Sequence, residues 1–94
     1  MTGQRSKIVI VDDDVGIMQC VGSFLERHEN LDVVGYAHHA MAGLALALEK
    51  QPDIVLHDIH MPGADPFWAC RQIVDRSKDT IKVLYYTGFP RDQY

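Results

Sequence analysis

The sequence predicts an α/β fold in which helices flank a parallel sheet, and three observations lead to it. Short β-branched or apolar runs alternate along the chain with segments of helical periodicity. Turn-forming or acidic residues follow each run, and no apolar run is long enough to span a membrane. Strands that alternate with helices pair in parallel through right-handed crossovers. We therefore expect one domain over residues 1–94, with the order βαβαβαβ.

The composition is that of a small folded domain. Of the 94 residues, 47% are hydrophobic and 23% are charged, which is enough for a core and not typical of disorder. The net charge of −4 argues against a nucleic-acid-binding surface in this segment. Two cysteines, Cys20 and Cys70, are too few for a disulfide framework, and we expect both in the core. With no signal-peptide core before Lys7, these features predict a cytoplasmic protein without membrane contact.

The first half of the chain contains two expected strands and two expected helices. Residues 7–11 form a β-branched run that ends in three adjacent aspartates, of which Asp14 suits the N-cap of a helix. The apolar face expected for that helix consists of Ile17, Val21, Phe24, Leu25 and His28. Leu31–Ala37 predicts a second strand, and Ala40–Lys50 has the periodicity of a second helix.

Residues 52–62 contain the run on which the expected sheet is centred. Ile54, Val55 and Leu56 follow a proline and are too few for a helix, so they predict a strand buried on both faces. The strand ends in Asp58, and a carboxylate there is costly unless it is paired, metal-bound or in chemical use. His57 precedes Asp58, so we expect its side chain on the opposite face of the sheet.

A third helix and a fourth strand complete the pattern. Asp65 as N-cap and Pro66 at the first helical position predict a helix start. The apolar face expected for this helix, which runs to about residue 77, consists of Phe67, Cys70, Ile73 and Val74. Trp68 follows Phe67 and cannot share its face, so we expect one of the two to be exposed. Residues 81–86 predict the fourth strand, which Thr87 follows.

Acidic and hydroxyl groups follow three of the four expected strands. Parallel strands bring their carboxyl ends to one edge of the sheet, so Asp12, Asp13, Asp58 and Thr87 should meet there. Converging carboxylates suit a hard divalent cation such as Mg²⁺. A metal-bound carboxylate beside a hydroxyl suits phosphoryl transfer, in which an aspartate can itself be the nucleophile. No histidine spacing in the chain matches a zinc pattern.

Three motifs in this order resemble the receiver domain of two-component response regulators. The matching stretches are Asp12-Asp13-Asp14 after an apolar strand, Pro52-Asp-Ile-Val-Leu-His-Asp58-Ile-His-Met-Pro62-Gly63, and Thr87-Gly88. The intervals between them also agree with the family, and the likeness covers residues 7–87. The strand at residues 33–37 is most similar to receivers joined to a DNA-binding helix-turn-helix domain.

The resemblance implies a role for each residue at the expected site. Asp58 would be the phosphoacceptor, and it would also contact Mg²⁺. Asp13 would bind Mg²⁺ directly, Asp12 mainly through water, and the backbone carbonyl of His60 would be a further ligand. Thr87 would donate a hydrogen bond to the phosphoryl group and couple its arrival to a loop shift. A histidine kinase or a phosphotransfer protein would supply the phosphoryl group.

The chain departs from the family pattern at two points. Pro66 stands where the family usually has glycine, which changes only the start of the third helix. The lysine that the family carries at the end of a fifth strand has no counterpart, because Lys78 and Lys82 lie at the wrong end of the fourth strand. We therefore expect an incomplete flavodoxin-like, doubly wound sheet of strand order 2-1-3-4, without the fifth strand. Residues 81–86 would then form an exposed edge, which predicts a homo-oligomer.

The leading functional hypothesis is a phosphorylation-controlled signalling module, which turns over no substrate apart from losing its own phosphate. One alternative is a fragment of a phosphatase of the haloacid-dehalogenase type, in which Asp12 would be the nucleophile and Asp14 the general acid. Gly16 and the short chain fit that alternative poorly. A second alternative is a receiver that is not phosphorylated and acts only by binding proteins.

Overall fold

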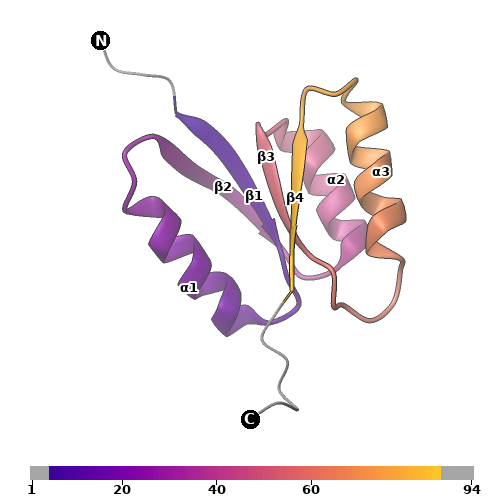
Figure 1. The fold of residues 1–94 in the computed structure, drawn as a ribbon, viewed down its shortest axis with the longest axis horizontal. Helices are drawn as coiled ribbons and strands as arrows, with labels where there is room; N and C mark the ends of the chain where they lie inside the picture. Colours follow the sequence, from indigo (N-terminus) through magenta and orange to yellow (C-terminus); the bar gives the residue numbers. More distant parts are fainter. Residues whose placement is uncertain (1–4, 88–94) are drawn as a thin grey trace.

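The computed structural model describes residues 5–87 and has the predicted order of elements (Figure 1). Its strands and helices are β1 (Ser6–Val11), α1 (Val15–Glu26), β2 (Leu31–Ala37), α2 (Ala40–Lys50), β3 (Ile54–Asp58), α3 (Pro66–Arg76) and β4 (Lys82–Tyr86). The four strands form one sheet of order β2-β1-β3-β4, and every neighbouring pair is parallel. The predicted fold class and strand order are thereby confirmed. Gly88, the second residue of the Thr87-Gly88 motif, lies outside the described residues.

Helices cover the two faces of the sheet unequally. Figure 1 shows α1 on one face and both α2 and α3 on the other. On the α1 face the buried core consists of Ile8, Ile10 and Met18. The larger core on the other face includes Val9, Val11, Leu44, Val55 and Ile73. Alternate residues of β1 therefore serve both cores, which is why this strand is an unbroken β-branched run.

The core side of α1 agrees only in part with the predicted one. Phe24 was expected in the core, but it is 58% exposed and packs edge-on against His28, with 5.5 Å between the ring centroids. The buried stripe instead consists of Met18, with Val21 and Leu25 packed beside it. Cys20 was also expected in the core and is exposed, because it lies two positions from Met18 and so faces away from the sheet. Cys70 is buried, as predicted.

The start of α3 has the predicted cap, and its buried face differs from the predicted one at Phe67. Asp65 accepts a hydrogen bond from the amide of Phe67, and Pro66 is the first helical residue. Phe67 and Trp68 are both about half exposed, so the expectation that Phe67 lies on the buried face is wrong. The small residues Ala69 and, as predicted, Cys70 are buried at this end of the helix. They let α3 pack closely, and the ring of Phe67 is left at the margin against Tyr85, with 5.2 Å between the centroids.

The carboxyl ends of the parallel strands meet at one edge of the sheet (Figure 1). The loops that lead from β1 into α1 and from β3 into α3 lie there, so they are placed for a shared site. At the side of the sheet, β4 pairs only with β3 among the described strands, and Leu84 and Tyr85 are about half exposed. None of the helices in residues 5–87 is both long and apolar enough to cross a membrane.

Candidate functional site

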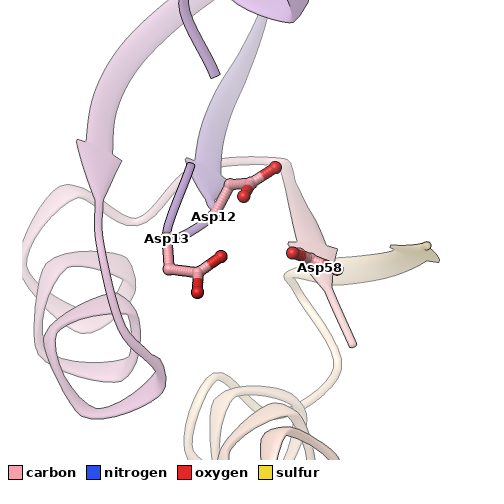
Figure 2. A group of neighbouring side chains, drawn as sticks. All are labelled: Asp12, Asp13 and Asp58. Carbon is pink, nitrogen blue, oxygen red and sulfur yellow. The ribbon is translucent and has the colours of Figure 1, made fainter. Parts of the chain in front are cut away.

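Three aspartates from two strand ends face a common space. Asp12 and Asp13 directly follow β1, and Asp58 is the last residue of β3. Each contributes one carboxylate oxygen to a group in which these oxygens all lie within 4.8 Å of one another (Figure 2). Asp12 is 1% and Asp58 3% exposed, while Asp13 lies at the open side. The structure thus brings these three side chains together, as the parallel strand ends predict.

Backbone amides hold the two buried carboxylates in place. Asp12 accepts through Oδ1 from the amide of Asp14 at 2.9 Å, and Asp58 accepts through Oδ1 from the amide of His60 at 2.9 Å. The third aspartate of the acidic run serves the helix, since Asp14 Oδ1 accepts from the amide of Ile17 at 3.0 Å and caps α1. Both hydrogen bonds to the buried carboxylates span two residues, as in Asx turns, so each loop fixes the aspartate that begins it.

Burial and like charges raise the pKa of Asp58 above its ordinary value. Loss of hydration contributes most, and the hydrogen bond from the amide of His60 acts in the opposite direction. The neighbouring Asp12 and Asp13 raise the pKa further. No cationic side chain of the described residues is among the groups that shift this pKa. A cation bound among the three aspartates would therefore relieve their repulsion.

The donor set fits a hard divalent cation. All three side chains offer carboxylate oxygens, and one of them is open to solvent, which suits Mg²⁺ because this ion retains several waters. His60 was expected to add its backbone carbonyl. The structure shows that its amide contacts Asp58 and that its side chain is exposed. The carbonyl ligand stays a prediction.

Thr87 lies at the same edge of the sheet but is not hydrogen-bonded to the aspartates. It directly follows β4, and its neighbour Tyr86 pairs with Asp58 in the sheet register. Its side chain is exposed, and its hydroxyl forms no hydrogen bond to another residue of the described range 5–87. The switch role expected for Thr87 therefore stays a prediction.

Tyr86 is a site residue that the sequence reasoning missed. Its hydroxyl donates a short hydrogen bond to Oδ2 of Asp12. Burial, followed by this contact with Asp12, raises the pKa of Tyr86 above its usual range, so the phenol keeps its proton. The strand register is the signal that could have identified it. Leu84 pairs with Leu56 and Tyr86 with Asp58, so Tyr86 lies on the same face of the sheet as the central aspartate.

His57 points away from the acidic group, as predicted from its place beside Asp58. It is fully buried on the face covered by α2 and α3, and Nδ1 lies 2.8 Å from the carbonyl oxygen of Asp58. Its Nε2 has no hydrogen-bond partner among the described residues. Burial lowers the pKa of His57, so the ring is neutral at pH 7.

Comparison with known proteins identifies one family. The sequence profile of the response regulator receiver domain matches residues 8–94. The transcriptional regulatory protein LiaR of Bacillus subtilis is 31% identical over 86 residues, which are 92% of this chain and 40% of LiaR. Protein PilH of Pseudomonas aeruginosa is 39% identical over 83 residues, 87% of this chain and 67% of PilH. The chain thus spans well under two thirds of LiaR and most of PilH.

Solved structures agree with the sequence comparison. The receiver domain of the response regulator NarL from Mycobacterium tuberculosis superposes with a TM-score of 0.81 at 26% identity, over 95% of this chain and 73% of that one. A two-component response regulator of the LuxR family from Aurantimonas gives a TM-score of 0.82 at 28% identity, over 89% of this chain and 59% of that one.

Proposed function

Because the chain belongs to the family of response regulator receiver domains, we propose that it accepts a phosphoryl group on Asp58 with the help of Mg²⁺. The observation that carries the proposal is the group formed by Asp12, Asp13 and Asp58 at the carboxyl edge of the sheet. The donor is a histidine kinase or a phosphotransfer protein of a two-component system. The domain covers residues 1–94 and works as a signalling module rather than as an enzyme with an external substrate.

The side chains have distinct parts in the proposed reaction. A carboxylate oxygen of Asp58 forms the new bond to phosphorus while the bond between phosphorus and the donor nitrogen breaks. The amide of His60 holds the carboxylate in orientation. Mg²⁺, when bound, supplies positive charge to the transferring phosphoryl oxygens. Asp13, which is exposed, would bind the ion directly, and Asp12 would bind it mainly through water.

Thr87 completes the proposed site as the phosphoryl-sensing hydroxyl. It lies one residue beyond Tyr86, which pairs with Asp58 in the register. A phosphoryl group on Asp58 would project beyond the carboxyl end of β3, the side on which the exposed hydroxyl of Thr87 lies. A shift of the segment at Thr87 toward the phosphoryl group would then change the surface beside β4.

Intact-mass measurement after incubation with acetyl phosphate and Mg²⁺ tests the phosphoacceptor. The wild type should gain one phosphoryl group, and Asp58→Asn should gain none. Asp75→Asn, which changes an exposed aspartate on α3, is the matched control and should behave as the wild type. Labelling of Asp12 instead of Asp58 would support the phosphatase alternative. Absence of any label in a protein that also fails to bind Mg²⁺ would support the unphosphorylated receiver.

The similarity to LiaR and to LuxR-family regulators supports a place in transcription control. The present chain would then be the input part of a longer regulator, located in the cytoplasm with its kinase partner. DNA contact would belong to the other part, since this segment carries a net charge of −4. Fusion of the chain to an unrelated DNA-binding domain, followed by a reporter assay with and without the phosphoacceptor, would test whether phosphorylation is transmitted.

The outer edge of β4 supports a homo-oligomer. The strand pairs only with β3 among residues 5–87, and its residue Leu84 is half exposed. Unpaired backbone groups on an apolar edge favour pairing with another chain. Light scattering at micromolar concentration should therefore show a dimer or a larger species. Leu84→Lys should shift it toward the monomer, whereas Met41→Lys, at an exposed position on α2, should not. A monodisperse wild-type monomer would refute this assembly.

A further inference from the structure

Tyr86 and the amide of Asp14 occupy both oxygens of Asp12. The hydroxyl of Tyr86 donates to Oδ2, and the amide of Asp14 donates to Oδ1 at 2.9 Å. Asp12 is 1% exposed, so water cannot replace these donors freely. A carboxylate so deeply buried is costly unless it is hydrogen-bonded, and these two donors meet that need in the absence of a metal ion.

The backbone of Tyr86 is fixed to the site independently of its side chain. Its carbonyl accepts from the amide of Ile59 at 3.1 Å, and Ile59 directly follows Asp58. The residue also pairs with Asp58 in the register between β3 and β4. The strand cannot move away without breaking these bonds, so the hydroxyl can leave Asp12 only by a rotation of the tyrosine side chain.

The phenolic proton of Tyr86 and a divalent cation would compete for the negative charge of Asp12. A hydrogen bond to an ionised acceptor is stronger than one between neutral groups, and it stabilises the arrangement in which it is made. A ligand shifts the equilibrium between two protein states only by as much as its affinities for those states differ. The Tyr86 contact stabilises the metal-free state, and it must weaken when a cation is bound at Asp12. It therefore lowers the affinity of the site for the cation.

We propose that Tyr86 is a latch on the Mg²⁺ site, which holds Asp12 in the metal-free protein and sets the Mg²⁺ concentration at which the site fills. This inference rests on the proposed function, because it assumes that Asp12, Asp13 and Asp58 hold the ion. It adds a positioning residue on β4 that regulates that site. Thr87 follows Tyr86 directly, so the latch lies beside the residue that carries the proposed phosphoryl-sensing hydroxyl.

Calorimetric titration with Mg²⁺ alone tests the latch on the full 94-residue chain. Tyr86→Phe removes the hydroxyl and keeps the ring, so the metal-free protein should melt at a lower temperature and the Kd for Mg²⁺ should fall about three- to tenfold. Tyr85→Phe is the matched control. It removes a hydroxyl from the adjacent position of β4, where the phenol lies beside Cys70 rather than Asp12, and should leave the Kd unchanged.

Three further results separate failure of the latch from failure of the proposed metal site. Equal or weaker Mg²⁺ binding by Tyr86→Phe than by the wild type would overturn the latch and leave the proposed metal site intact. Absence of Mg²⁺ binding in all three proteins would overturn the metal site itself, and the latch with it. If Tyr86→Phe does not fold, near-ultraviolet difference absorption of the wild type serves instead. Mg²⁺ should change a tyrosine signal that Tyr85→Phe retains, and an unchanged spectrum at saturating Mg²⁺ would overturn the latch.

Discussion

The ring of His57 is hydrogen-bonded to the backbone of Asp58, with 2.8 Å between Nδ1 and the carbonyl oxygen. Because the carbonyl can only accept, Nδ1 carries the proton and Nε2 is unprotonated. Nε2 is buried without a hydrogen-bond partner among the described residues. A second proton on the ring would therefore create an unpaired charge in the core, directly behind the central aspartate.

The first prediction is a loss of stability on mild acidification that depends on His57. Burial lowers the pKa of His57 below 6.5 in the folded protein. Below pH 6.5 the unfolded chain takes up a proton that the folded chain does not, so the free energy of unfolding falls as the pH falls toward the folded-state pKa. The loss is about 1.4 kcal/mol for each unit by which the two pKa values differ.

Urea unfolding of the wild type and His57→Leu between pH 7.5 and pH 5 measures this effect. The variant should lose less stability than the wild type over that range. His28→Leu, which changes an exposed histidine just beyond α1, should keep the wild-type dependence. Equal pH dependence in the wild type and His57→Leu would show that another group causes the loss.

The second prediction concerns the charge of Asp58 in the absence of metal. Its pKa is raised in the folded state, so its contribution to stability is greatest below pH 3.8 and is lost as the pH rises through the folded-state pKa. Asp58→Asn should therefore be more stable than the wild type at pH 7 in a metal-free buffer. That advantage should shrink as the pH approaches 4. Thermal melts of both proteins at several pH values provide the measurement, and a variant less stable than the wild type at pH 7 would contradict the assignment.

The third prediction is a stabilisation by Mg²⁺ that depends on the acidic group. An ion that binds only the folded state raises the melting temperature as its concentration exceeds its Kd. Millimolar Mg²⁺ should raise the melting temperature of the wild type, and Asp13→Asn should lose most of the rise. Potassium chloride at equal ionic strength controls for screening of surface charge. A melting temperature that does not change with the Mg²⁺ concentration would contradict a metal site.

The fourth prediction concerns the close packing of α2 on β1. A Cβ at Gly43 would lie 2.7 Å from Cγ2 of Val11, which is fully buried and immediately precedes Asp12. Gly43→Ala should lower the free energy of unfolding by about 1–3 kcal/mol through overpacking, in spite of the better helix propensity of alanine. Gly16→Ala meets its nearest atom only at 3.4 Å and should be neutral or stabilising. Chemical unfolding compares the two, and a neutral Gly43→Ala would mean that Val11 can move aside.

Much of the fold follows from local sequence signals. Aspartate at 65 and proline at 66 predict the start of α3, because their side-chain and backbone preferences act within one turn. The meeting of Asp12, Asp13 and Asp58 follows from topology, because any parallel sheet brings these strand ends to one edge. These features need no knowledge of how the side chains pack.

The errors concern burial, which depends on partners distant in the sequence. Cys20 and Phe24 have the hydrophobic character of core residues, but α1 contacts the sheet over a narrow stripe centred on Met18. Phe67 and Trp68 are exposed because Ala69 and Cys70 let α3 approach the sheet with its small residues. Hydrophobic periodicity predicts that a helix has an apolar side, but it does not say how wide the buried part is.

The sequence by itself determined the order of the elements, the parallel sheet and the meeting of three carboxylates at one edge, because these depend on backbone preferences and chain direction. The tertiary structure alone decided what surrounds those carboxylates. The register between β3 and β4 places Tyr86 opposite Asp58, and the hydroxyl of Tyr86 then reaches Asp12, 74 residues earlier in the chain. Such a contact joins β4 to the residue that follows β1, a strand that is not its neighbour in the sheet, so it arises only when twist, register and side-chain length act together.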